Sequence, residues 1–197
     1  MISKIAQKIV DALCVASVVD EEDKELYTYG FFVLVSRIFF FVITIIWGIA
    51  FGILWESILF YFVFTVIRSY AGGVHASKES SCTLYTSLAM LISTMVIKMF
   101  LYMKITIVPA IILLIGYVLI VIFSPLDTNE KPLDDNERRK YKKITCLLVT
   151  VVLAGVAVFC IMGRNNIVHI CAVAVGLEST LLLIGVIKKK GSYTYLP

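Results

Sequence analysis

Long apolar stretches separated by short polar segments dominate the chain. Five such stretches cover residues 30–67, 84–102, 105–123, 144–162 and 167–187. Each of the last four has the roughly 17 to 25 residues that a helix needs to cross the hydrocarbon layer of a membrane. The first is too long for one crossing and is interrupted by Glu56 and Ser57, so we interpret it as a hairpin of two helices turning near Trp55. The pattern therefore predicts six membrane-spanning helices.

The first residues of the chain show a different pattern, with apolar and polar positions on opposite faces of a helix. One face of residues 2–16 carries Ile2, Ile5, Ala6, Ile9, Val10 and Leu13. The other face carries Ser3, Lys4, Gln7, Lys8 and Asp11. This spacing predicts an amphipathic helix, which suits either the membrane surface or packing against the bundle.

Composition agrees with a membrane environment. Hydrophobic residues make up 60% of the 197 residues and charged residues 16%, with a mean hydropathy of +0.94, which is more apolar than an ordinary soluble domain. Backbone polar groups must be paired in lipid, and the alternation of a membrane strand is absent, so the spans must be helices. We predict an all-α integral membrane protein, a bundle of about six transmembrane helices with an N-terminal amphipathic helix, as a single domain over residues 1–197.

The distribution of positive charge predicts the orientation of the bundle. Fourteen of the 18 lysines and arginines fall at the two termini, between the second and third spans, and after the fourth span. Lys98, Lys104 and Arg164 fall on the other side. Because lysine and arginine are enriched in cytoplasmic segments, we assign both termini and the segment between the second and third spans to the cytoplasm of a multi-pass cell-membrane protein.

Several polar residues admit more than one interpretation. The polar stretch 124–143, in which prolines stop the preceding helix, is a cytoplasmic connector whose basic end either determines topology or binds an acidic peptide or lipid. Arg37 and Glu178 lie inside apolar stretches, where ionisable groups usually face the bundle interior, a partner or water. They could pair with each other or across a subunit interface, and snorkelling also explains Arg37. For His169 we favour a structural role.

The segment RSYAGGVHASKESSC, residues 68–82, carries the most distinctive chemistry. It contains His75, the only histidine outside an apolar stretch, and Cys82, the only cysteine in a polar setting. A neighbouring imidazole can accept the thiol proton and so generate the thiolate that acyl transfer needs. In an unbroken helix the two side chains would lie about 10.5 Å apart along the axis, so the chain must bend between them.

Local features of this segment allow such a bend. Gly72, Gly73 and the polar run 77–81 can interrupt a helix. Ser80 or Ser81 could then cap the next helix and leave Cys82 in its first turn, where the helix dipole favours the thiolate.

Four of these residues resemble the signature of a known family. Arg68, Gly73, His75 and Cys82 follow the order R-x4-G-x-H-x6-C between hydrophobic helices, which resembles the AgrB accessory gene regulator peptidases. The string SPLDTNEKPL at 124–133, with the basic cluster after it, resembles the second cytoplasmic loop of that family. The resemblance implies a membrane cysteine endopeptidase that removes the C-terminal tail of an AgrD-like precursor peptide in quorum sensing. It also implies that a cysteine or serine of the precursor then closes a thiolactone or lactone ring.

The resemblance implies a role for each matching residue. Cys82 is the catalytic nucleophile, and His75 is the general base and later the acid that protonates the leaving amine. Arg68 either binds a carboxylate of the precursor or anchors the end of the second helix, and Gly73 serves a backbone that needs positive φ or close approach. The expected partners are the precursor and membrane lipid, with a homodimer as a further expectation.

Other classes of function remain as alternatives. The sequence shows no metal-ligand cluster, phosphate loop or nucleic-acid motif, so we expect no cofactor, no metal and no nucleic-acid partner. One alternative is a non-enzymatic membrane transporter or peptide exporter, in which Arg37 and Glu178 line a polar path. Another is a membrane protease that uses Glu178 in place of Cys82.

Overall fold

A computed structural model of the chain describes residues 2–73, 79–126 and 133–193, and the regular elements in these ranges are helical. They form seven α-helices, namely α1 (Ile2–Val15), α2 (Lys24–Phe51), α3 (Leu54–Ala71), α4 (Glu79–Met103), α5 (Ile107–Phe123), α6 (Asp135–Ile161) and α7 (Asn166–Tyr193). A short 3-10 helix, Glu21–Asp23, precedes α2. The predicted all-α class is confirmed.

Within these ranges, four helical segments are long and apolar enough to cross a membrane. They are Glu21–Phe51, Ser80–Met103, Asp135–Ile161 and Asn166–Lys188. The other two helices at predicted spans are shorter, with 18 residues in α3 and 17 in α5. The structure thus has the apolar helices of a membrane protein.

The first apolar stretch forms the expected hairpin, but its turn lies earlier than predicted. Gly52 ends α2 with a φ of 69°, a left-handed conformation that glycine adopts without strain. Its N–H points at the carbonyls of Gly48 and Ile49. Trp55 and Glu56 therefore belong to the first turn of α3. The glycine, rather than the polar pair after it, determines where the chain reverses.

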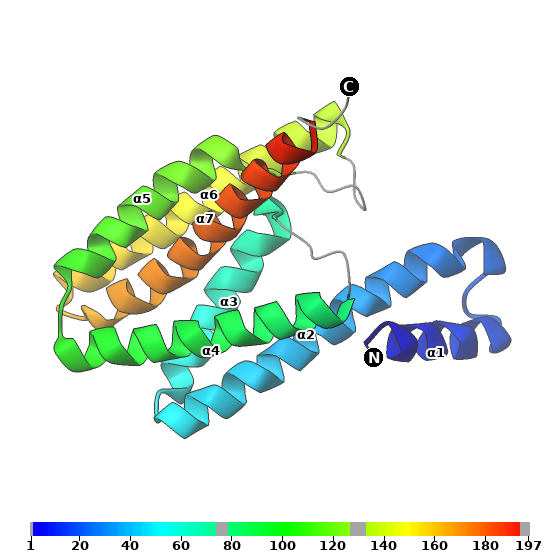
Figure 1. Cartoon of the computed structure of the whole chain (residues 1–197), viewed down its shortest axis with the longest axis horizontal. Helices are drawn as coiled ribbons and strands as arrows, with labels where there is room; N and C mark the ends of the chain where they lie inside the picture. Colours follow the sequence, from blue (N-terminus) through cyan, green and yellow to red (C-terminus); the bar gives the residue numbers. More distant parts are fainter. Residues whose placement is uncertain (1, 74–78, 127–132, 194–197) are drawn as a thin grey trace.

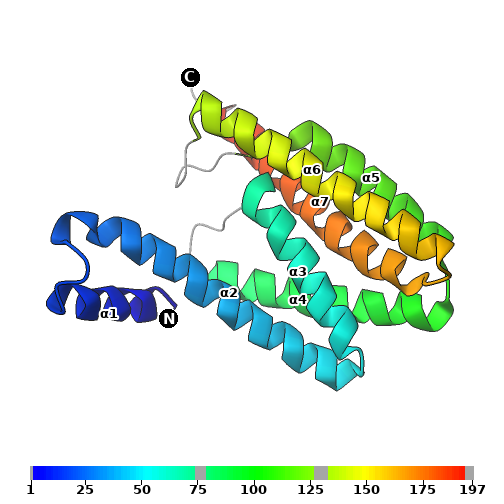
Figure 2. The ribbon, with the colours of Figure 1, turned by 180° about the vertical axis from the view of Figure 1, so that it is seen from behind.

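Helix α7 lies at the centre of the fold and packs against α3, α4, α5 and α6. Figures 1 and 2 show it running beside α5 and α6, with α3 crossing this group. A helix that is apolar on all sides is suited to this buried position. Small residues allow close approach, because a Cβ on Gly116 of α5 would lie only 2.8 Å from a methyl carbon of Val175. The residues of α7 therefore contribute to both hydrophobic clusters of the core.

Helix α1 packs against the first half of α2, as Figure 1 shows. Its buried residues are Ile2, Ala6 and Val10, which lie on the predicted apolar face. An ion pair of 3.0 Å joins Asp11 of α1 to Lys24 at the start of α2. These contacts agree with packing of α1 against the bundle, and a position at the membrane surface stays a prediction.

The predicted connector 124–143 is shorter than expected, because α6 already begins at Asp135. Asp134 caps the helix by accepting a hydrogen bond from the N–H of Asp135 at 2.8 Å, and acidic residues in the first turn complement the helix dipole. The basic cluster from Arg138 to Lys143 is therefore helical. One of its members, Lys142, donates to the carbonyls of Val121 and Ser124 at the end of α5.

Candidate functional site

A cavity of about 460 Å³ lies between α2, α3, α4 and α7, at the end of the bundle where α3 stops. Much of its wall is apolar or aromatic, with Phe32, Phe40, Tyr61, Phe64, Met90, Leu177 and Leu181. The polar part of its described lining includes Arg37, Arg68, Ser69, Cys82 and Thr86. The structure thus brings two arginines and the candidate nucleophile to one cavity.

Cys82 lines this cavity from the first turn of α4 and is half-buried. Its predicted place at a helix start is confirmed, so the positive end of the helix dipole lies beside the thiol. Ser80 and Ser81 are inside α4, so the prediction that one of them caps the helix is wrong. The predicted general base, His75, lies outside the described residues.

The remaining cysteines provide a comparison for Cys82. Cys14 lies on α1, Cys146 and Cys160 on α6, and Cys171 on α7. None of these four is among the described residues that line the cavity. All five are thiols without a disulfide.

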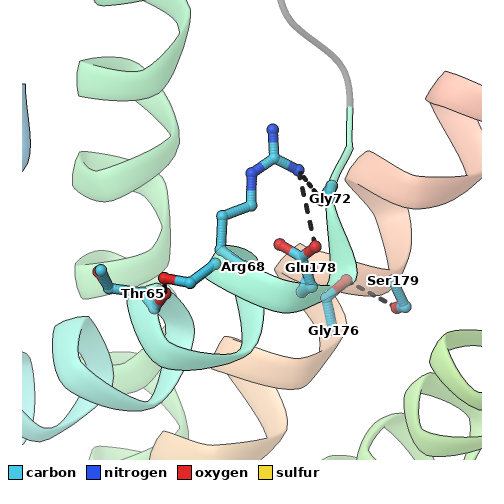
Figure 3. A network of polar contacts seen from close by, with 7 residues as sticks. Thr65, Arg68, Gly72, Gly176, Glu178 and Ser179 are labelled. Atoms are coloured by element: carbon cyan, nitrogen blue, oxygen red, sulfur yellow. Dashed lines mark hydrogen bonds and ion pairs between the residues drawn. The ribbon is translucent and has the colours of Figure 1, made fainter. Parts of the chain in front are cut away.

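Arg68 holds together the turn that follows α3 (Figure 3). Its Nη1 donates to the carbonyl of Gly72 at 2.9 Å and lies 3.6 Å from Oε1 of Glu178 on α7. Glu178 is fully buried, whereas the Arg68 side chain is 21% exposed. A carboxylate in an apolar interior needs a cation nearby, and the last turn of α3 supplies it. Pairing of Glu178 with Arg37, one of the alternatives that the sequence left open, is not what the structure shows, because Arg68 of α3 is the cation beside Glu178.

The two glycines after α3 occupy positions where a side chain would not fit. Gly73 has a φ of 140°, and a Cβ there would overlap the guanidinium of Arg68. Gly72 has a φ of 77°, and a Cβ there would overlap the carbonyl of Leu126. The N–H of Leu126 in turn donates to the carbonyl of Ala71 at 2.9 Å. Gly73 thus has the positive φ and the close approach that its predicted backbone role requires, and the turn is fixed from two sides.

The ion pair predicts an asymmetry in stability. Replacing Arg68 by Met leaves the Glu178 carboxylate buried without a cation, and we expect a loss of about 3 to 5 kcal/mol in the free energy of unfolding. Replacing Glu178 by Gln should cost only about 1 to 2 kcal/mol, because the guanidinium stays in contact with the cavity. Thermal unfolding in detergent micelles measures both variants, with the exposed Arg164→Met as control. Equal losses in the two variants would contradict the arrangement.

Arg37 points to the same cavity from α2. Its Nη2 donates to Oγ of Ser69 at 3.0 Å. Its own backbone carbonyl accepts a hydrogen bond of 2.6 Å from the hydroxyl of Tyr61. Both contacts join α2 to α3, so the arginine is held by the hairpin. The sequence indicated that Arg37 was unusual, but it contained no signal for Ser69 or Tyr61 as partners.

His169 lies at the other end of the bundle, near the turn between α4 and α5. It is buried, with Nε2 2.9 Å from the carbonyl of Ile105 and its ring beside Phe100. These contacts agree with the structural role predicted for it. Among the residues that the structure describes, no group of three or more His, Cys, Asp or Glu side chains could hold a metal ion.

The fold and the site together define an apolar helical bundle of membrane type with a cysteine in a cavity of mixed apolar and cationic character. Residues 2–182 match the protein family Accessory gene regulator B (AgrB). The chain therefore belongs to the AgrB family. Proteins of this family process autoinducing-peptide precursors in quorum sensing and are generally peptidases.

Two relatives illustrate the similarity. The chain is 26% identical to AgrB-like protein 2 of Clostridium perfringens (strain 13 / Type A) over 171 residues, which cover 84% of this chain and 80% of that protein. It is 31% identical to an AgrB-like protein of Listeria monocytogenes serotype 4b (strain CLIP80459) over 143 residues, 70% of this chain and 67% of that protein. No solved structure matches the chain significantly.

Proposed function

We propose that this protein is a membrane cysteine endopeptidase that removes the C-terminal tail of an AgrD-like precursor through an acyl-enzyme on Cys82. The observation that carries the proposal is the position of Cys82, in the first turn of α4 and at the wall of the cavity. A volume of about 460 Å³ falls within the range of about 300 to 1,000 Å³ that is usual for ligand sites. Family membership supports the same activity.

In the proposed reaction, His75 accepts the proton of the Cys82 thiol, and the thiolate attacks the carbonyl carbon of the scissile peptide bond. The C–N bond of the resulting tetrahedral intermediate breaks, and His75 returns the proton to the leaving amine of the tail. The upstream part of the precursor is now a thioester on Cys82. A cysteine or serine of that part attacks the thioester carbonyl, which closes the ring and restores the Cys82 thiol.

Arg68 and Gly73 support the site in this proposal without touching the reacting atoms. The guanidinium holds the carbonyl of Gly72 at 2.9 Å, and the glycine leaves room for the guanidinium. Together they determine the direction in which the chain leaves α3 toward His75. Of the two roles expected for Arg68, anchoring the end of this helix is the one that its contacts favour.

The proposal also includes the topology. Residues 1–197 form one domain with six spans, α2 to α7, in which the short helices α3 and α5 cross the membrane as well. Lengths of 18 and 17 residues lie near the lower limit of about 17 residues for a span. The concentration of lysine and arginine supports a cytoplasmic position for both termini and for the Cys82 end of the bundle. The precursor and membrane lipid are the proposed partners, with a homodimer as the proposed assembly.

Co-expression with candidate precursor peptides, followed by mass spectrometry, tests the proposed activity. We expect a released tail and a cyclic product lighter than the linear hydrolysis product by one water, because ring closure replaces attack by water on the thioester. An exporter without peptidase activity would instead deliver the precursor with its tail intact. That result, obtained for every precursor that the protein binds, would contradict the proposal.

A further inference from the structure

The described lining of the cavity has an unbalanced positive charge. Its described lining contains Arg37 and Arg68 but no aspartate or glutamate. Arg68 has its counter-ion in Glu178, behind the cavity wall. Among the described residues, the side chain of Arg37 makes a single hydrogen bond, to the neutral hydroxyl of Ser69. A guanidinium has five N–H donors, so the described residues leave most of the donors of Arg37 available to a ligand.

The position of Arg37 differs from that of an arginine that merely snorkels toward the membrane surface. It belongs to the face of α2 that lines the cavity, together with Val33, Ser36 and Phe40, whose spacing of three and four residues matches one side of a helix. Leu34 and Ile38, with exposed fractions of 50% and 55%, are not among the lining residues. Arg37 is also exposed, but unlike these two residues it lines the cavity that Cys82 also lines.

The contacts of Arg37 also hold its guanidinium in place. Ser69 accepts from Arg37 and uses its own proton in a 2.6 Å hydrogen bond to the carbonyl of Thr65. The hydroxyl of Tyr61 donates to the backbone carbonyl of Arg37 and so holds the backbone of the arginine. Arg37 is itself an exposed residue. A guanidinium held at the wall of a cavity beside aromatic side chains nevertheless loses less conformational freedom on binding an anion than a mobile surface charge does.

We propose that Arg37 binds a carboxylate of the precursor peptide, so that the cavity accepts a peptide segment with an acidic group beside apolar side chains. This inference rests on the proposed function and adds a specificity-determining residue to it. A guanidinium and a carboxylate form paired hydrogen bonds of matching geometry. Phe40, Phe64 and Leu177 of the same cavity provide the apolar surface for neighbouring side chains. The carboxylate belongs to an aspartate, a glutamate or a peptide terminus.

Two alkylating reagents of nearly equal size test this subsite without any turnover. Iodoacetate is an anion and iodoacetamide is neutral, and both react with the same thiolate, so the ratio of their rates at Cys82 cancels differences in thiol reactivity. In the full-length protein in uncharged detergent, we expect Arg37→Gln to lower the iodoacetate-to-iodoacetamide ratio about fivefold. Arg37→Lys should retain most of the ratio. The matched control Arg164→Gln should leave it unchanged, as should measurement at Cys146.

A second arm uses the precursor that the protein cleaves. Each acidic group of the peptide is converted to its amide in turn. One of these changes should raise KM in the wild-type protein and have no further effect in Arg37→Gln. An unchanged alkylation ratio in Arg37→Gln would overturn the inference while leaving the peptidase proposal intact. If Arg37→Gln lowers the alkylation ratio but the wild-type protein cleaves no precursor, the anion subsite would stand and the peptidase proposal would be overturned.

A lipid phosphate is the competing ligand for the same guanidinium. Adding phosphatidylglycerol to the micelles distinguishes the two, with phosphatidylcholine as the matched uncharged lipid. With either lipid present, we expect Arg37→Gln still to lower the iodoacetate-to-iodoacetamide ratio at Cys82 relative to the wild-type protein. Loss of that dependence with phosphatidylglycerol alone would overturn the peptide carboxylate and assign the site to lipid.

Discussion

Replacement of Cys82 by alanine is expected to abolish release of the precursor tail, with a loss in rate of at least about 10³-fold. The proposed reaction depends on one sulfur atom as nucleophile, and alanine provides no atom that can form the thioester. The measurement is the rate of tail release, followed by mass spectrometry with purified full-length protein in micelles. Unchanged thermal unfolding of the variant would show that the loss is chemical.

The matched control is Cys146→Ala, which removes a half-buried thiol from α6 outside the described lining of the cavity. This variant should process the precursor at the wild-type rate. If Cys82→Ala continues to cleave, the sulfur does not take part in the chemistry. The buried carboxylate of Glu178 would then be the group to test as the catalytic residue.

Replacement of Gly73 by alanine is expected to lower turnover by about 10- to 100-fold. Two effects of the substitution both lower turnover. A φ of 140° is strained for any residue with a Cβ, by about 1 to 3 kcal/mol. The added methyl group would also displace the guanidinium of Arg68 and break its 2.9 Å hydrogen bond to Gly72. The turn that leads from α3 toward His75 would then lose its direction.

Steady-state measurement of tail release checks this prediction, and Gly155→Ala is its control. A Cβ on Gly155 would meet no atom within 4 Å, so that variant should be fully active. Wild-type turnover in Gly73→Ala would mean that the chain accommodates the methyl group. The prediction that the methyl group displaces Arg68 and so slows the reaction would then be wrong.

The helices could be predicted from sequence because lipid requires long, uninterrupted apolar segments. The bounds of α4 and α5 lie within five residues of the predicted ones. The start of α6 was missed by nine residues, since its first turns are charged and do not follow the hydropathy signal. The reversal at Gly52 lies three residues before the predicted turn near Trp55, because Glu56 is the stronger polar signal although the glycine controls the backbone.

The chemistry of single residues could be predicted better than their partners. Cys82 stood out by its polar surroundings, and its place in the first turn of α4 is confirmed. The pairing of Arg68 with Glu178 joins residues far apart in the sequence, and it depends on how α3 packs against α7. The same holds for Arg37 and Ser69, which the hairpin brings together. The role of His75 stays a prediction.

The most direct test of the acyl-enzyme is intact-protein mass spectrometry of the wild-type protein mixed with a precursor whose ring-forming residue is changed to alanine. Such a precursor can acylate Cys82 but cannot close the ring, so the thioester should accumulate. Because a peptide amide is more stable than a thioester, continuous removal of the released tail should increase the amount. We expect a mass increase equal to the retained part of the precursor, sensitive to hydroxylamine and absent from Cys82→Ala. Tail release from this precursor without any such mass increase, in a reaction that Cys82→Ala also performs, would contradict the acyl-enzyme.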